Sequence, residues 1–206
     1  IQGNIGLLAS QATLSIPISK KSGLFISGRK TYIDEIIAPI LKSGSKNNDV
    51  QDMKYGFYDH NLTFITEISK NSLLTVSAFS SDDKLQIKDS NLALRTSLKW
   101  SNLNISPTLL TKLSSKTSMS NSIYFTQYKN ELDMEQATIG MRVFSSVQDF
   151  GFANSVNYLV EETSFESGLQ YVYHNLQPQK IQIENLSTTN NTIENTLIRA
   201  NEFAVF

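Results

Sequence analysis

Apolar and polar residues alternate with a period of two along most of this chain, a pattern that favours β-strands with two different faces. In the segment 164–175, for example, Phe165, Leu169 and Tyr171 fall on one face and mostly polar residues fall on the other. Helical spacing is convincing only in the short stretch 33–41. The sequence therefore predicts an all-β fold.

The composition limits the environment and the partners of this sheet. The longest apolar runs, such as Ile36–Leu41, are far shorter than the ~20 residues that a membrane helix needs, so any membrane span consists of strands. The 18 basic and 19 acidic residues, with a pI near 6.2, favour no nucleic-acid partner. Because the chain contains no cysteine, disulfides and thiolate metal sites are excluded.

The alternation predicts about nine antiparallel strands joined by connectors of two lengths. The predicted strands are 7–18, 23–32, 56–69, 73–81, 90–101, 118–129, 148–160, 164–175 and 199–206. Short connectors are expected at 19–22, 70–72 and 161–163, and long polar ones at 33–55, 82–89, 130–147 and 176–198. The segment 102–117 is too long for a short connector, and Thr108–Leu113 either extends a strand or forms an extra hairpin.

Two all-β architectures fit this pattern: a soluble β-sandwich and a transmembrane β-barrel. Strands of ten or more residues, aromatic residues near strand ends and alternating connector lengths favour the barrel. The sequence therefore predicts a single curved sheet with no second layer on its apolar face. The lipid-facing side is predicted to include Leu92, Leu94, Leu98, Leu169 and Tyr171.

Five segments resemble the barrel of TonB-dependent receptors of the Bacteroidota type. They are Gly3–Ile16, Leu24–Asp34, Ser145–Tyr158, Tyr171–Ile181 and the final NEFAVF. The resemblance implies a barrel of about 22 strands that takes up a scarce nutrient through the outer membrane with energy from the TonB complex. Residues 1–206 would then be a barrel segment, an interior fragment whose plug domain, remaining strands and TonB-contacting segment lie elsewhere.

The resemblance also implies which partners the segment has. The edges of an incomplete barrel must pair with further strands, because unpaired amides in lipid cost several kcal/mol each. A plug domain, the TonB complex, outer-membrane lipid and a surface lipoprotein are the expected partners. No cofactor is implied.

Charged residues on the polar face are the candidate site residues. Arg29, Asp59, Asp149 and His174 lie toward the outer end and are predicted to bind substrate, whereas Arg95 and Lys99 lie toward the periplasmic end and are predicted to contact the plug. The same register places Arg29, Glu67, Arg95, Lys99 and Gln170 together on one concave face.

Enzymatic chemistry is not expected. The two histidines, His60 and His174, are far apart and have no metal-ligand spacing, and no GxSxG sequence is present. The adjacent pairs Asp82–Asp83 and Glu161–Glu162 point to opposite sides of an extended chain. The leading function is nutrient uptake, and the alternatives are a structural scaffold barrel and a soluble ligand-binding sandwich. The sequence leaves glycans, peptides, metal chelates and cobalamin open as substrates.

Overall fold

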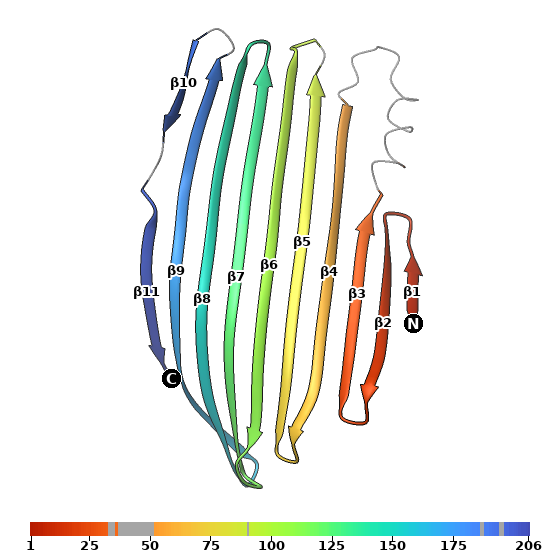
Figure 1. Ribbon diagram of the computed structural model, residues 1–206, viewed down its shortest axis with the longest axis vertical. Helices are drawn as coiled ribbons and strands as arrows, with labels where there is room; N and C mark the ends of the chain where they lie inside the picture. Colours follow the sequence, from red (N-terminus) through yellow and green to blue (C-terminus); the bar gives the residue numbers. More distant parts are fainter. Residues whose placement is uncertain (33–35, 37–51, 90, 186–187, 194–195) are drawn as a thin grey trace.

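A computed structural model describes residues 1–32, 36, 52–89, 91–185, 188–193 and 196–206. These residues form a single antiparallel sheet of eleven strands (Figure 1). The strands are β1 (Gln2–Ile5), β2 (Ala9–Ser19), β3 (Ser22–Thr31), β4 (Asp52–Ser69), β5 (Ser72–Asp89), β6 (Leu94–Lys112), β7 (Thr117–Gln136), β8 (Ile139–Val160), β9 (Thr163–Asn185), β10 (Thr188–Ile193) and β11 (Ile198–Val205).

Each strand from β1 to β10 pairs with the next one in the sequence, and β11 also pairs with β9. The strand β10 pairs with β9 at Ile181–Asn185, whereas β11 pairs with it at Leu169–Leu176, so the two short strands share one edge of β9. The nine predicted strands correspond to β2–β9 and β11. The strands β1 and β10 were not predicted, because segments of four and six residues carry almost no periodic signal.

The central strands are much longer than the alternation predicted, from 18 residues in β4 and β5 to 23 in β9. The segments 82–89 and 130–147 were predicted as loops, but they belong almost wholly to strands. Thr108–Lys112 extends β6, and the turn to β7 is short. The segment 33–51 lies outside the described residues except for residue 36. A strand of 22 residues spans about 70 Å, whereas ~9–11 residues cross a bilayer, so the strands continue well beyond any membrane.

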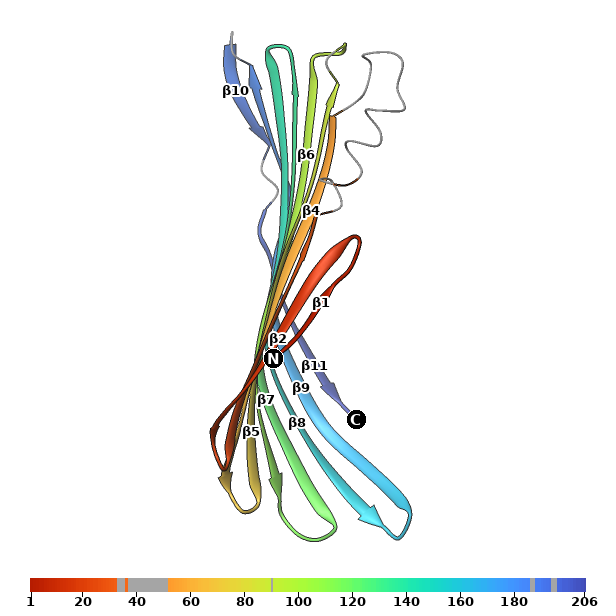
Figure 2. The same ribbon diagram turned by 90° about the vertical axis from the view of Figure 1, so that its right-hand side faces the viewer.

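The sheet is a single twisted layer, as Figure 2 shows from the side. Among the described residues, Val172 is the buried hydrophobic residue, with 5% of its surface exposed, and no large side chain is fully buried. A two-layer sandwich would bury a row of large apolar side chains between its sheets. The single-layer prediction is therefore confirmed, and the soluble sandwich is wrong. No described helix is long and apolar enough to cross a membrane.

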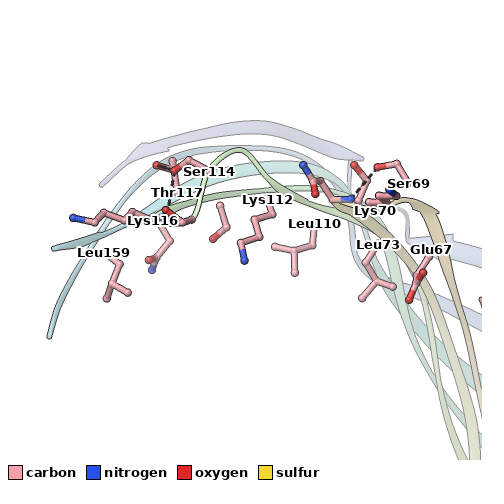
Figure 3. Close-up of a pocket in the computed structure, with 15 residues that line it drawn as sticks. Glu67, Ser69, Lys70, Leu73, Leu110, Lys112, Ser114, Lys116, Thr117 and Leu159 are labelled. Carbon is pink, nitrogen blue, oxygen red and sulfur yellow. Dashed lines mark hydrogen bonds between the residues drawn. The ribbon is translucent and has the colours of Figure 1, made fainter. Parts of the chain in front are cut away.

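The register divides the strand residues between two faces, because directly paired residues in an antiparallel sheet point to the same side. Figure 3 shows Glu67, Leu73 and Lys112 beneath the arch of the sheet, and we call this side the concave face and the other the convex face. Continuous pairing from β3 to β9 then assigns every residue in these strands that it aligns. Arg29 and Gln170 share the concave face with Glu67, as predicted.

Arg95 and Lys99 lie on the opposite face. Arg29 pairs with Asp59, which pairs with Ser81, and Ser81 pairs with Asn102. The even-numbered residues of β6 are therefore concave and the odd-numbered ones convex. The predicted shared face is wrong for Arg95 and Lys99, and the predicted lipid-facing position is wrong for Leu94 and Leu98.

The reason is that the polarity of the two faces inverts along the strands. We call the turns 20–21, 70–71, 113–116 and 161–162 the lower turns. Toward the lower turns the convex face is apolar, and we call its residues there the apolar belt. The belt comprises Leu62, Phe64, Leu74, Val76, Ile105, Leu109, Ile123, Phe125, Phe150, Phe152, Leu169 and Tyr171. The opposite part of the sheet comprises residues 52–58 of β4, 82–89 of β5, 94–101 of β6, 129–136 of β7 and 139–146 of β8, and we call it the upper extension. In the upper extension the convex face is charged and the concave face is apolar. Leu94 and Leu98 belong to this extension.

Candidate functional site

The concave face of the upper extension carries an aromatic cluster formed by Tyr55, Phe57 and Trp100. The Tyr55 and Trp100 rings are stacked with centroids 6.4 Å apart, and the Tyr55 and Phe57 centroids are 6.2 Å apart. Tyr55 and Phe57 alternate on β4, and the register aligns Phe57 with Asp83 and Asp83 with Trp100. Three rings from two non-adjacent strands therefore form one surface facing the hollow side of the sheet.

A carboxylate lies within this aromatic surface. The Tyr55 hydroxyl donates a hydrogen bond to Asp83 Oδ1 at 3.2 Å. Burial, followed by the negative charge of Asp83 and this hydrogen bond, raises the pKa of Tyr55, so the phenol remains protonated as a donor. The cluster thus combines ring faces for stacking with a carboxylate that accepts hydrogen bonds.

An ion pair lies directly below the cluster. Arg29 Nη2 is 2.6 Å from Asp59 Oδ2, and Arg29 Nε donates to the same oxygen at 2.7 Å. The Arg29 guanidinium also lies 4.8 Å from the centroid of the Phe57 ring, within the range of a cation–π contact. The Arg29 side chain is 50% exposed while that of Asp59 is only 10% exposed, so the guanidinium is held in place and still faces the solvent.

A second polar group lies on the concave face of β8, β9 and β11. His174 Nδ1 is 2.8 Å from Asp149 Oδ1, and His174 Nε2 is 3.4 Å from Glu202 Oε2. The register brings these residues together, since His174 pairs with both Asp149 and Ala200. A carboxylate oxygen therefore lies near each ring nitrogen, and the hydrogen bond between His174 Nδ1 and Asp149 orients the ring.

The four residues predicted to bind substrate form two pairs rather than one site. Arg29 meets Asp59, and Asp149 meets His174, but β5, β6 and β7 separate the pairs. Sequence reasoning missed the aromatic cluster. The available signal was that Tyr55 and Phe57 alternate in step with Asp59, which places all three on one face.

The residues predicted to contact the plug are elsewhere. Lys99 lies on the convex face of the upper extension, with its Nζ 3.0 Å from Glu131 Oε1 and 3.7 Å from Asp133 Oδ2. Arg95 lies further from the lower turns on the same face of β6. Both are therefore at the opposite end of the strand from the predicted one.

A separate hollow of about 510 Å³ lies on the concave side at the end with the lower turns (Figure 3). Leu73, Leu110 and Leu159 line it together with the charged residues Glu67 and Lys112. Among the residues that the structure describes, no group of three or more His, Asp or Glu side chains could hold a metal ion.

No protein-family model matches this chain, and no curated protein sequence is similar to it at a significant level. Among solved structures, the chain is similar to the ferric yersiniabactin uptake receptor FyuA from Yersinia pestis, with a TM-score of 0.59 and 8% sequence identity. The match covers 96% of this chain and 34% of the receptor, so the chain spans about a third of the length of that protein. The fold is accordingly that of a segment of a large antiparallel β-barrel.

Proposed function

We propose that this chain is an arc of the barrel of an outer-membrane receptor that takes up a nutrient with energy from the TonB complex. The apolar belt supports this location, because its large side chains face outward from a single layer and only lipid or another apolar phase solvates them well. The likeness to a solved receptor barrel supports the architecture. A Bacteroidota-type receptor and a surface lipoprotein partner remain predictions of the sequence resemblance.

The observation that carries a receptor function, as opposed to a passive wall, is the aromatic cluster above Arg29. A water-filled lumen favours polar side chains on its wall. Aromatic side chains on this face instead suit contact with the rings of a bound substrate. Arg29 adds a fixed positive charge at the base of the cluster. The substrate therefore contacts the upper concave face, with Arg29 and Asp59 orienting it.

The lower concave face has a different proposed role. A plug domain fills the barrel and packs against the hollow lined by Leu73, Leu110 and Leu159. The sheet edges at β1 and at β10 and β11 pair with the remaining strands of the barrel, because backbone amides in lipid need partners.

The test is ligand binding by the purified full-length protein against a panel of ferric chelates, cobalamin, oligosaccharides and peptides. Trp100→Ala and Arg29→Gln should each weaken binding of the compound that wild type recognises, by about 2 kcal/mol for the tryptophan if it is a central contact. Phe144→Ala removes an aromatic ring from the convex face of the same extension and is the matched control. A scaffold barrel without transport would bind no compound, and the growth of a deletion strain would be unchanged on every nutrient.

A further inference from the structure

Two asparagines face outward in the middle of the apolar belt. Asn121 on β7 and Asn154 on β8 are directly paired, and the same register continues to the belt residues Leu109 and Leu169 on either side of them. All four residues are therefore on the convex face. The neighbouring pairs on this face of β7 and β8 are apolar, with Ile123 opposite Phe152 and Met119 opposite Val156.

The two asparagine side chains satisfy each other only in part. Asn154 Nδ2 donates a hydrogen bond to Asn121 Oδ1 at 2.7 Å, and among the described residues neither side chain has a second hydrogen bond. A carboxamide offers two N–H donors and one carbonyl acceptor. The pair therefore keeps free N–H groups on Asn121 Nδ2 and a free carbonyl on Asn154. Both side chains are only partly buried, so these groups reach the outer surface of the sheet.

Free amide groups are unfavourable at this depth of the belt. The acyl region of a membrane contains no water to accept or donate hydrogen bonds, so a polar group there needs a partner within the protein or on a neighbouring protein. Polar side chains inside a membrane accordingly mark functional positions, and amides form hydrogen bonds between membrane-spanning segments. The asparagine pair therefore predicts a partner that brings hydrogen-bonding groups to the same depth.

A second copy of this chain supplies these groups by symmetry. In a symmetric dimer of barrels that share one orientation in the membrane, the two-fold axis is parallel to the membrane normal. An axis that passes between β7 and β8 places Asn121 of each copy opposite Asn154 of the other copy. The free N–H of Asn121 then donates to the free carbonyl of Asn154 in both directions. One symmetric contact thus forms two hydrogen bonds and satisfies the groups that a single copy leaves without a partner.

The surface around the asparagines is accessible to a second copy. The strands β7 and β8 lie inside the sheet, away from both of its edges, so strands that extend the sheet do not cover them (Figure 1). Ile123 is 63% exposed and Phe152 is 37% exposed, and they lie on either side of the same axis. Each Ile123 then faces Phe152 of the other copy. Apolar packing does not by itself favour protein over lipid, whereas the two hydrogen bonds do.

We propose that the convex surface at Asn121 and Asn154 is the interface of a homodimer within the membrane. The inference rests on the proposed membrane location, because in water the free amide groups need no protein partner. It assigns a partner to the outer surface of the barrel, on the face opposite the aromatic cluster.

The experiment measures the association of the purified full-length protein in vesicles of neutral phosphatidylcholine. Copies labelled with a donor or an acceptor fluorophore are mixed, and energy transfer is followed as the ratio of protein to lipid falls. A hydrogen bond between membrane segments contributes about threefold to thirtyfold, so Asn121→Leu/Asn154→Leu, which loses two, should weaken the dimer by at least about tenfold. The matched control is Ser22→Ala/Thr66→Val, which removes a hydrogen-bonded polar pair from the same face at the β3–β4 ladder. It should change association by less than about twofold.

Disulfide cross-linking tests the geometry while both asparagines stay in place, so it decides the question even if the leucine variant fails to fold. Ile123→Cys lies beside the proposed axis and should give a cross-linked dimer when isolated outer membranes are mildly oxidised. Leu62→Cys, 38% exposed on the same face of β4, lies far from the axis and should not. Heat-modifiable gel migration verifies that each variant is folded.

The proposal is overturned if the wild-type protein is monomeric at every density in the vesicles, or if the leucine variant and its control associate equally. It is also overturned if Ile123→Cys cross-links to a different protein, because the surface then has another partner. Failure of the wild-type protein to fractionate with the outer membrane would instead overturn the proposed function.

Discussion

Gly151 leaves the space that the ring of Tyr124 occupies on the concave face, and filling this space tests how the sheet is packed. A methyl group built on Gly151 would lie 1.9 Å from the Tyr124 Cζ atom, far inside any real contact distance. In Gly151→Ala the ring must therefore move. The move also breaks the hydrogen bond that Gln170 Nε2 donates to the Tyr124 hydroxyl at 2.7 Å.

The expected cost follows from these two losses. Overpacking of a fitted site costs about 1–3 kcal/mol, and a lost hydrogen bond adds about 0.5–1.5 kcal/mol. We expect Gly151→Ala to lower the free energy of unfolding by about 2–4 kcal/mol, measured by urea unfolding of the full-length protein in detergent micelles. Gly56→Ala is the matched control, since a methyl group there meets nothing within 4 Å.

A double-mutant cycle separates the clash with Tyr124 from a general intolerance of side chains at Gly151. In a Tyr124→Ala background the obstructing ring is absent, so Gly151→Ala should cost less than about 1 kcal/mol. An equal cost in both backgrounds would refute the packing explanation.

Three further outcomes are expected. Leu169→Arg, in the apolar belt, should cost about 2–4 kcal/mol near the bilayer midplane and impair the heat-modifiable gel migration of the folded barrel, whereas Leu94→Arg should leave this migration unchanged. Burial raises the pKa of Asp133, but its hydrogen bond and attraction to Arg142, with Glu131 and Lys99 nearby, hold that pKa below its usual value. The stabilisation is present above the unfolded-state pKa and lost as pH falls through the folded-state pKa, so the urea midpoint of Asp133→Asn should be below that of wild type at pH 7 and approach it in acid. Glu161 has a φ of 55° in its turn, so Glu161→Gly should raise the thermal midpoint by relieving about 1 kcal/mol of backbone strain, while the same change at Glu162 should not.

Local alternation was enough to predict most strands and the correct face of several. In β4, Leu62 and Phe64 oppose Asn61 and Thr63, and the structure places the first pair on the convex face and the second on the concave face. This works because that part of β4 has apolar surroundings on one side and polar surroundings on the other, as the rule assumes.

The same rule gave the wrong face for β6 because the surroundings change along the strand. Leu94, Leu98 and Trp100 alternate with charged residues as cleanly as the belt residues do, but in the upper extension the apolar side is the concave one. The alternation within a short segment shows that the two faces of a strand differ in polarity. It does not show which of the two faces is the convex one. Only the pairing between strands, which depends on contacts distant in the sequence, resolves this.

The candidate site needed the same long-range information. Arg29 and Asp59 are separated by the segment 33–51, so no local pattern aligns them. The aromatic cluster also joins β4 to β6 across β5. The sequence indicated these charged residues as candidates, but their grouping depends on the register of several ladders.

In the proposed membrane location, the inversion of polarity along the strands would also fix how deeply the barrel sits in the bilayer. A uniformly amphipathic strand could slide along the membrane normal at little cost, because each new position would resemble the last. Here an inward shift by two residue pairs, about 14 Å along a strand, would carry Lys129 into the acyl region. A lysine at the midplane costs about 2–4 kcal/mol, and an outward shift would expose rings such as Phe125 and Phe150 to water. The boundary between the apolar belt and the upper extension would therefore set the position of the barrel along the membrane normal. It would also keep the aromatic cluster at a constant height above the lipid.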